Sequence, residues 1–226
     1  MTDRFDYSNL PGTDLPGTDL PATDLPGRDL PDAEPVPTTR IQPGNAIPAI
    51  QLPQLDGSPF DSRELAGRRY LLSFYRFASC PFCNLRVHQL VMDSEHWPES
   101  FTAVAIFDSP LDNLQKHAGR HQAPFPILAD ASNRYYRRFG VEHSWWRTLK
   151  GGLLGLPRVL YAMVVKGYWP TSFKGRIDTM PLDILVDEKG VAQMVYYGRD
   201  EGDHLPLEQV QAFAQGARVE GAKTLE

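Results

Sequence analysis

Beyond residue 40, the hydrophobic positions of the chain change repeatedly from a strand pattern to a helix pattern. Continuous apolar or aromatic runs at 70–75 and 101–107 are typical of strands buried on both faces of a sheet. The runs 182–187 and 191–197 flank the turn Glu188-Lys189-Gly190 and predict a β-hairpin. Shorter extended pieces are expected at 46–52 and 126–129.

Helical spacing of apolar residues separates these strands. Residues 81–92 carry it most clearly, with apolar side chains at Phe82, Leu85, Val87, Leu90 and Val91. Residues 131–139 look helical and stop at Gly140, a residue suited to a helix C-terminus. Further helices are predicted at 111–120 and 207–217. This order of elements predicts an α/β fold with a central mixed sheet flanked by helices.

The first 40 residues have a different composition. Residues 10–32 repeat a five-residue unit, Leu-Pro-Gly-Thr-Asp, with small variations, and ten of the 20 prolines precede residue 54. Proline at this frequency interrupts both helices and strands, and one leucine per repeat buries too little surface to offset ordering. We therefore predict a disordered acidic tail over 1–40 and one folded domain over 41–220. The tail is interpreted as a spacer, with partner binding as the alternative.

Charge and hydropathy narrow the function classes. The net charge is -5, and residues 1–35 hold eight acidic residues against two basic ones, so the remainder is nearly neutral. Nucleic-acid binding needs a clear basic excess and is not expected. No signal peptide and no apolar run of about 18 residues is visible, so a cytoplasmic protein is expected.

The chain has two cysteines, and both lie in Cys80-Pro81-Phe82-Cys83. This segment follows a predicted strand and opens a predicted helix. The free N–H groups and the dipole of a helix N-terminus favour an anion, which lowers the pKa of a cysteine there. Pro81 suits the first helical position because its missing N–H costs nothing there. Arg76 and Arg86 add positive charge nearby, and Arg76 is expected to support the thiolate.

Two interpretations of the cysteine pair do not involve redox chemistry. The cysteines could be half of a zinc site, although the only close histidine pair is His117 and His121. They could also be an inert buried pair. A disulfide across four residues would constrain the unfolded chain very little, which favours a chemical role.

Residues 73–83 resemble the active-site segment of the peroxiredoxin (AhpC/TSA-type) branch of the thioredoxin superfamily. The opening 43–48, the turn 55–57 and the ending 196–204 are also similar to that family, so the resemblance covers about 43–217 and implies a thioredoxin-like fold. In the family's pattern, Cys83 takes the peroxidatic position. Cys80 replaces the signature threonine and Arg76 the signature proline.

A second departure lies before the strand at 182–187. Met180 and Pro181 stand where peroxiredoxins place an arginine. Thioredoxins place a cis-proline there, with the preceding backbone free to pair with a bound peptide. Both departures favour dithiol–disulfide exchange, with Cys80 attacking and Cys83 resolving. The alternative is a thiol peroxidase in which Cys83 attacks hydroperoxide and Cys80 resolves.

An insertion is predicted at 143–180. From His143 to Arg176 there are six basic residues and no acidic one, interleaved with tryptophans and aliphatic residues. This composition is typical of an interfacial segment. The insertion could therefore bind substrate, a partner or a membrane surface, or it could be a helix packed on the core with its lysines in water.

The remaining candidates are individual side chains. His204 is expected on a surface loop, with a place capping or lining the site as the alternative. Asp183 and Asp187 are expected at strand ends facing solvent, with a proton acceptor at one of them as the alternative. Flavin and nicotinamide fingerprints are absent from the sequence, so no cofactor is expected and electrons would come from a protein or a low-molecular-weight thiol. A role in antioxidant defence and redox homeostasis is expected. A redox-sensing module without turnover remains a third hypothesis.

Overall fold

The structure, a computed structural model, describes residues 40–146, 148, 155–171 and 175–219. The predicted tail over 1–40 lies outside the described residues except for Arg40. Parts of the insertion, at 147, 149–154 and 172–174, lie outside them as well. No helix in the described ranges is long and apolar enough to cross a membrane.

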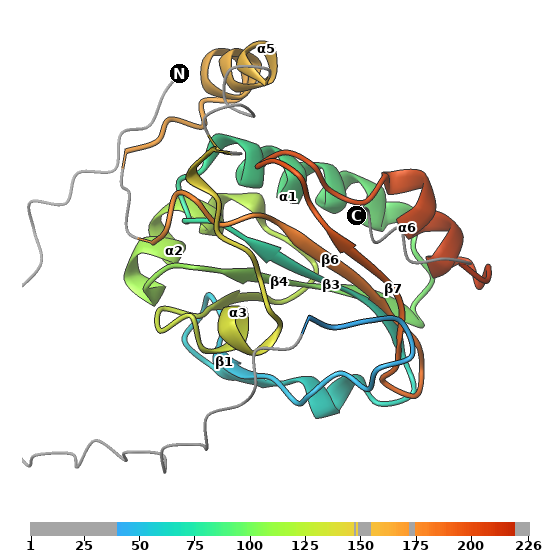
Figure 1. The fold of residues 1–226 in the computed structure, drawn as a ribbon. Coiled ribbons are helices and arrows are strands. Elements are labelled where there is room, and N and C mark those ends of the chain that lie inside the picture. The colour runs from blue at the N-terminus through green and yellow to red at the C-terminus, as the bar shows by residue number, and fades with distance from the viewer. Residues whose placement is uncertain (1–39, 147, 149–154, 172–174, 220–226) are drawn as a thin grey trace, which may run out of the picture. The chain divides into compact units, whose positions relative to one another are not determined.

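A five-stranded sheet forms the centre of the fold (Figure 1), with the strand order β5-β4-β3-β6-β7. Strand β3 pairs parallel with β4 and antiparallel with β6, so the predicted mixed sheet is confirmed. The strands of this sheet are β3 (Arg69–Tyr75), β4 (Phe101–Phe107), β5 (Ile127–Ala129), β6 (Leu182–Val186) and β7 (Ala192–Tyr197). The predicted hairpin is the antiparallel pair of β6 and β7.

Helices cover both faces of the sheet. On one face, a hydrophobic cluster joins α1, α2 and α6 to side chains such as Leu71 and Tyr75 of β3. On the other, α3 and the hairpin of β1 and β2 pack against Leu72 and Phe74. The bounds are α1 (Pro81–Asp93), α2 (Leu111–Ala118), α3 (Arg134–Arg138), α5 (Leu156–Leu160), α6 (Leu207–Ala214), β1 (Gln51–Pro53) and β2 (Pro59–Asp61). Since alternate side chains of a strand face opposite sides and both sides of this sheet are covered, β3 is apolar or aromatic at five of its seven positions, and Ser73 is a buried polar exception.

Short helical turns connect these elements. They are η1 (Ser62–Leu65), η2 (Ser94–His96), η3 (Gly119–His121) and the π-helical turn η4 (Tyr161–Val165), which continues α5 directly. The turn η4 contacts α1, and Lys166 Nζ lies 3.1 Å from His88 Nε2 on α1. The described end of the insertion is thereby attached to the helix that begins at the cysteines.

The expectation of a cis-proline at Pro181 is wrong, because the described residues contain no cis peptide bond. The backbone before Pro181 is also not free to pair with a peptide. The Met180 N–H donates to the Glu142 carbonyl at 2.9 Å, and Met180 is only 1% exposed. An isolated bridge between His143 and Thr179 precedes it, so a trans bond continues this extended segment into β6.

Candidate active site

Cys80 caps the N-terminus of α1, as the sequence predicts. Strand β3 ends at Tyr75, and a short turn then brings the chain to Cys80, whose N–H donates to the Phe77 carbonyl at 3.0 Å. The backbone N–H of Cys83 points at the Cys80 sulfur at 3.5 Å. Pro81 occupies the first helical position, where no hydrogen bond is lost. Cys80 therefore takes the place that a serine or aspartate N-cap usually takes.

Arg76 supplies the positive charge at this site. Its Nη2 donates to Cys80 Sγ at 3.2 Å, and its Nη1 donates to the Ile177 carbonyl at 2.7 Å. Burial lowers the pKa of Arg76, but the neighbouring Cys80 and Cys83 raise it by more, so the guanidinium stays charged. Arg86, also expected near the thiols, instead donates to the Leu205 carbonyl at 2.6 Å.

The two cysteines have opposite pKa shifts. Burial raises the pKa of Cys80, but the Cys83 thiol, the charge of Arg76 and the Cys83 N–H outweigh it and lower this pKa to about 5. Burial raises the pKa of Cys83 well above its usual value, and the adjacent Cys80 sulfur raises it further. One sulfur is thus held as a thiolate while its neighbour keeps its proton.

Both sulfurs are buried, with exposed fractions of 0% for Cys80 and 1% for Cys83, and neither is in a disulfide. They pack in the hydrophobic cluster on the α1 face of the sheet. A substrate sulfur or oxygen can reach Cys80 only after a neighbouring side chain or segment moves. Arg76 and the start of α1 lie against Cys80 in this buried position.

Asn84 fixes the turn that carries Cys80. Its Nδ2 donates to the carbonyls of Ala78 and Cys80 at 2.7 and 2.8 Å, and its Oδ1 lies 2.8 Å from His121 Nε2. Burial lowers the pKa of His121 to about 4, so the imidazole is neutral at physiological pH. Among the described residues, no three histidine, cysteine, aspartate or glutamate side chains form a metal-binding group.

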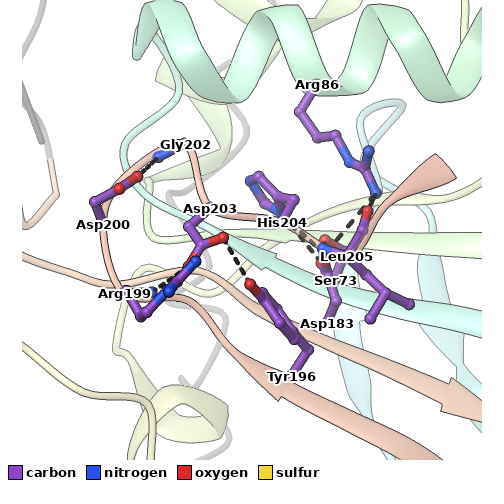
Figure 2. Close-up of polar contacts among 10 residues, drawn as sticks. All are labelled: Ser73, Arg86, Asp183, Tyr196, Arg199, Asp200, Gly202, Asp203, His204 and Leu205. Atoms are coloured by element: carbon purple, nitrogen blue, oxygen red, sulfur yellow. Dashed lines mark hydrogen bonds and ion pairs between the residues drawn. The ribbon is translucent and has the colours of Figure 1, made fainter. Parts of the chain in front are cut away.

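A second polar cluster surrounds Asp183 of β6 (Figure 2). Ser73, opposite it in the sheet register, donates to its Oδ1, and His204 Nδ1 lies 3.1 Å from its Oδ2. The Leu205 N–H donates to Oδ2 at 2.8 Å, and Arg86 Nη2 lies 3.9 Å from it. Burial raises the pKa of Asp183, but these partners outweigh it and lower that pKa to about 2. The carboxylate stays ionised inside the protein.

The loop 198–204 connects this cluster to the cysteines. Asp203 accepts hydrogen bonds from Tyr196 Oη at 2.6 Å and from the Arg199 backbone at 2.9 Å, and Asp200 accepts one from the Gly202 N–H (Figure 2). A Cβ added to Gly202 would lie 3.2 Å from the Phe82 ring, so the loop packs closely on Phe82, one of the two residues between the cysteines.

A cavity of about 450 Å³ lies between α1 and this loop. Its lining includes Phe82 and Arg86 of α1 and Gly202 and His204 of the loop. Neither cysteine is part of its lining, but Phe82, one of the two residues between them, forms part of its wall.

Several predictions for single residues are wrong. His204 is not a surface residue, since its side chain is 5% exposed, and Asp183 is 1% exposed rather than solvent-facing. Asp187 organises the hairpin turn, where its Oδ1 accepts from the N–H groups of Lys189 and Val191. The sequence interpretation also missed Asn84 and Glu201, because the burial of a polar side chain depends on contacts distant in sequence. A run of polar residues in 199–204 was the one available signal.

The insertion combines a buried side with an exposed apolar side. Ala162 and Tyr168 are buried, and the Tyr168 ring packs against His121 and under the Arg120 guanidinium. Large apolar side chains are nevertheless exposed along it, namely Trp145, Trp146, Leu156, Leu160, Tyr161, Val164, Val165 and Trp169. The insertion is therefore neither a helix packed fully into the core nor a segment free in solvent.

Comparisons of the sequence and of the three-dimensional structure with known proteins agree with each other. The model of the AhpC/TSA family matches residues 43–163, more than half of the chain. A protein named as a peroxiredoxin in Mycobacterium tuberculosis (strain H37Rv) is 25% identical over 118 residues, which are 50% of this chain and 75% of the relative.

Solved structures of low identity share the fold. The peroxidoxin BcpB from Mycobacterium tuberculosis is 16% identical with a TM-score of 0.58, over 80% of this chain and all of the other. A thiol peroxidase from Chromobacterium violaceum is also 16% identical, with a TM-score of 0.56, over 80% of this chain and 90% of the other. The thioredoxin-like fold expected from the sequence is confirmed.

Proposed function

Since the chain belongs to the AhpC/TSA family of thiol-dependent oxidoreductases, we propose that its reaction is dithiol–disulfide exchange, carried out by Cys80 and Cys83. The observation that supports this proposal is that the pKa values of the two cysteines are shifted in opposite directions. Cys80 has its pKa lowered to about 5, whereas burial and the Cys80 sulfur raise the pKa of Cys83. The thiolate is the nucleophile in thiol exchange, so Cys80 attacks first.

The reaction proceeds in two displacements. The Cys80 thiolate attacks one sulfur of a substrate disulfide, the new S–S bond forms, and the other substrate sulfur leaves and takes up a proton. Cys83 then loses its proton and attacks Cys80 Sγ, which releases the second substrate sulfur and leaves a Cys80–Cys83 disulfide. The substrate gains two electrons, and a protein or low-molecular-weight thiol returns them to the enzyme.

Arg76 and the start of α1 have defined roles in this scheme. The guanidinium, 3.2 Å from Cys80 Sγ, holds the attacking sulfur as an anion. Pro81 begins the helix at the residue after Cys80, so that the Cys83 N–H is directed at the same sulfur. Met180 and Pro181 support the site through packing at the start of β6 rather than through a free backbone.

Peroxidase activity is the second candidate, favoured by the family and by the names of the similar proteins. In the version predicted from the sequence, Cys83 attacks the peroxide, water or an alcohol leaves, and Cys80 displaces water from the sulfenic acid. The raised pKa of Cys83, caused by burial and by Cys80, makes it a poor first nucleophile. Either activity would contribute to antioxidant defence and redox homeostasis.

Separate serine substitutions test the assignment. The purified protein, Cys80→Ser and Cys83→Ser are each given a peptide disulfide or hydrogen peroxide, with a thiol reductant in excess. We expect Cys80→Ser to reduce the disulfide no faster than background. Cys83→Ser, mixed with the peptide disulfide without the thiol reductant, should accumulate a mixed disulfide visible by mass spectrometry. Peroxide turnover that survives Cys80→Ser but not Cys83→Ser would assign the peroxidatic role to Cys83. Stoichiometric oxidation without turnover would instead indicate a redox sensor.

We also propose that the insertion is a contact surface. Exposed apolar and aromatic side chains at Trp146, Val164 and Val165 combine with a sequence from His143 to Arg176 that has six basic residues and no acidic one. Such a surface suits an anionic lipid surface, where apolar side chains insert and cations neutralise headgroups.

A further inference from the structure

Two residues that line the cavity between α1 and the loop 198–204 each carry a buried polar atom that the exchange reaction does not use. Within the described part of the chain, Arg86 Nε and His204 Nε2 have no hydrogen-bond partner. Their side chains are only 7% and 5% exposed, so neither atom is open to bulk water. Leaving a buried polar atom unsatisfied is costly, so this pair of atoms calls for a partner that enters through the cavity.

The two atoms have complementary hydrogen-bonding roles. The ionised Asp183 carboxylate can only accept, so His204 Nδ1, 3.1 Å from its Oδ2, is the donor. In the neutral imidazole, Nε2 is then an acceptor that points away from Asp183, whereas Arg86 Nε is always a donor. Arg86 reaches from α1 toward the same carboxylate, with its Nη2 3.9 Å from Oδ2 (Figure 2). A peptide unit has one N–H and one C=O, which match this acceptor and this donor.

The more exposed part of the lining is acidic. Asp200 and Glu208 both line the cavity, the first half-buried and the second exposed. Among the described residues, neither forms an ion pair, whereas the third acid of the lining, Asp203, has its Oδ2 3.0 Å from Arg199 Nε. A cationic side chain of a bound molecule is therefore favoured beside Asp200 and Glu208, and an anionic one is repelled.

Apolar side chains complete the lining and connect it to the active site. Leu85 of α1 and Pro206 and Leu207 at the start of α6 offer apolar surface. Phe82, two residues after Cys80, is a further part of the wall. An extended chain rises about 3.3 Å per residue, so a residue two or three positions from a substrate cysteine can reach the cavity.

We propose that this cavity binds the polypeptide that carries the substrate disulfide, and that it selects a basic side chain near the substrate cysteine. This role rests on the proposed function. The backbone before Pro181 offers a substrate no pairing edge, because the Met180 N–H already donates to the Glu142 carbonyl at 2.9 Å. Recognition of the substrate backbone therefore falls to another part of the surface, and the cavity lies beside the first turn of α1.

The bound substrate makes two kinds of contact. One of its peptide units accepts a hydrogen bond from Arg86 Nε and donates one to His204 Nε2. A lysine or arginine side chain of the substrate pairs with Asp200 and Glu208. Since both inner atoms are closed in the free protein, the His204 ring adjusts as the peptide enters, a side-chain change that is common on binding.

Charge-matched peptide disulfides test the selectivity. Two short peptides each have one cysteine joined to the same small aliphatic thiol, and differ only in carrying lysine or glutamate at the second and third residues from that cysteine. We expect the wild type to reduce the lysine peptide with about tenfold higher kcat/KM, the size expected of two exposed ion pairs. Asp200→Asn/Glu208→Gln should reduce the lysine peptide more slowly and the glutamate peptide faster, which loss of folding cannot produce. Glu95→Gln/Glu99→Gln removes two exposed carboxylates beyond the other end of α1 and should keep the wild-type ratio.

The inner pair of atoms is tested by changing the substrate rather than the protein. N-methylation removes the peptide N–H of one residue at a time, over the three residues on either side of the cysteine of the lysine peptide. One position should lose roughly fivefold in kcat/KM, because His204 Nε2 then lacks its donor. If no position loses activity, the contact with a peptide unit is contradicted.

A small dialkyl disulfide without a peptide separates failure of this proposal from failure of the proposed function. If the wild type reduces it but treats the two peptides equally, or reduces neither peptide, the cavity does not select the substrate. A lysine preference that persists in Asp200→Asn/Glu208→Gln would also overturn the proposal. A wild-type protein that reduces neither the peptides nor the small disulfide would remove the proposed function itself, and this role with it.

Discussion

At the scale of single residues, the site depends on one buried ion pair. Cys80 is 0% exposed and Arg76 is 6% exposed, yet both are charged in the reduced protein. A buried charge is tolerated when a partner and hydrogen bonds satisfy it, and here the Cys83 N–H and Arg76 do so. The ionisation of Cys80 should therefore depend on Arg76 as well as on the thiol and the N–H group of Cys83.

The pH dependence of thiolate absorbance tests this. We expect the reduced protein to show one thiolate that titrates with a midpoint near pH 5, and a second that appears only well above pH 9. Removing the positive charge with Arg76→Gln should raise the first midpoint by about one to three pH units, the usual effect of an adjacent opposite charge. Arg63→Gln, which alters an exposed arginine, is the control. A midpoint that stays near pH 5 without Arg76 would contradict the assigned role.

Residue-level prediction succeeded where the cause was local. Cys80, Cys83 and Pro81 could be placed because a helix start is visible in the sequence and its electrostatics are general. Asn84, Asp183 and Glu201 could not be placed, because each depends on contacts across the chain. Asp183 shows this well: its partners Ser73 and His204 come from another strand and a distant loop.

At the scale of elements, long apolar patterns were predicted well and short ones only in part, since β5 lies within the expected extended piece 126–129. Strand β4 has the predicted bounds 101–107, and α1 begins at the predicted Pro81. The three-residue strand β2 was missed, since three residues carry too little periodicity. The insertion was also left without defined elements, and it contains α5 and the π-helical turn η4. A break in regular helical geometry depends on local packing that hydrophobic spacing does not reveal.

A vesicle-binding measurement tests the contact surface at this scale. We expect the protein to float with anionic phospholipid vesicles and to remain unbound with zwitterionic ones. Replacing Val164 and Val165, which are 70% and 63% exposed, by aspartate should abolish flotation, because charged side chains do not insert among lipids. Met92→Asp alters an exposed apolar side chain on α1 and should float like the wild type. If all variants were recovered equally with the anionic vesicles, or if none were, the lipid-binding role would be contradicted.

At the scale of the whole molecule, the oxidation state should change stability. The lowered pKa of Cys80 stabilises the reduced folded form at pH values above about 5, because the unfolded cysteine binds a proton more tightly. This contribution to the free energy of unfolding grows as the pH rises from about 5 to 9 and is lost as the pH falls through 5. A disulfide removes it and leaves Arg76 without its anion, while the four-residue loop adds little stability in return.

We therefore expect the reduced protein to unfold at a higher temperature than the oxidised protein at pH 8, with the difference shrinking toward pH 5. Calorimetry of the two forms in matched buffers measures it. The Cys80→Ser/Cys83→Ser double variant, which has neither thiolate nor disulfide, should show no dependence on reductant. An oxidised form that is the more stable of the two at pH 8 would contradict this electrostatic account.

Phe82 lies between the two cysteines in the sequence, and it also lines the cavity beside α1. Any rearrangement of the first turn of α1 on disulfide formation therefore reshapes that hollow. A molecule that fits one oxidation state better than the other would, by thermodynamic reciprocity, shift the reduction potential of the pair toward the state that it prefers. The concentration of a small ligand that binds in the cavity would then set whether the cysteine pair tends to gain or to lose electrons.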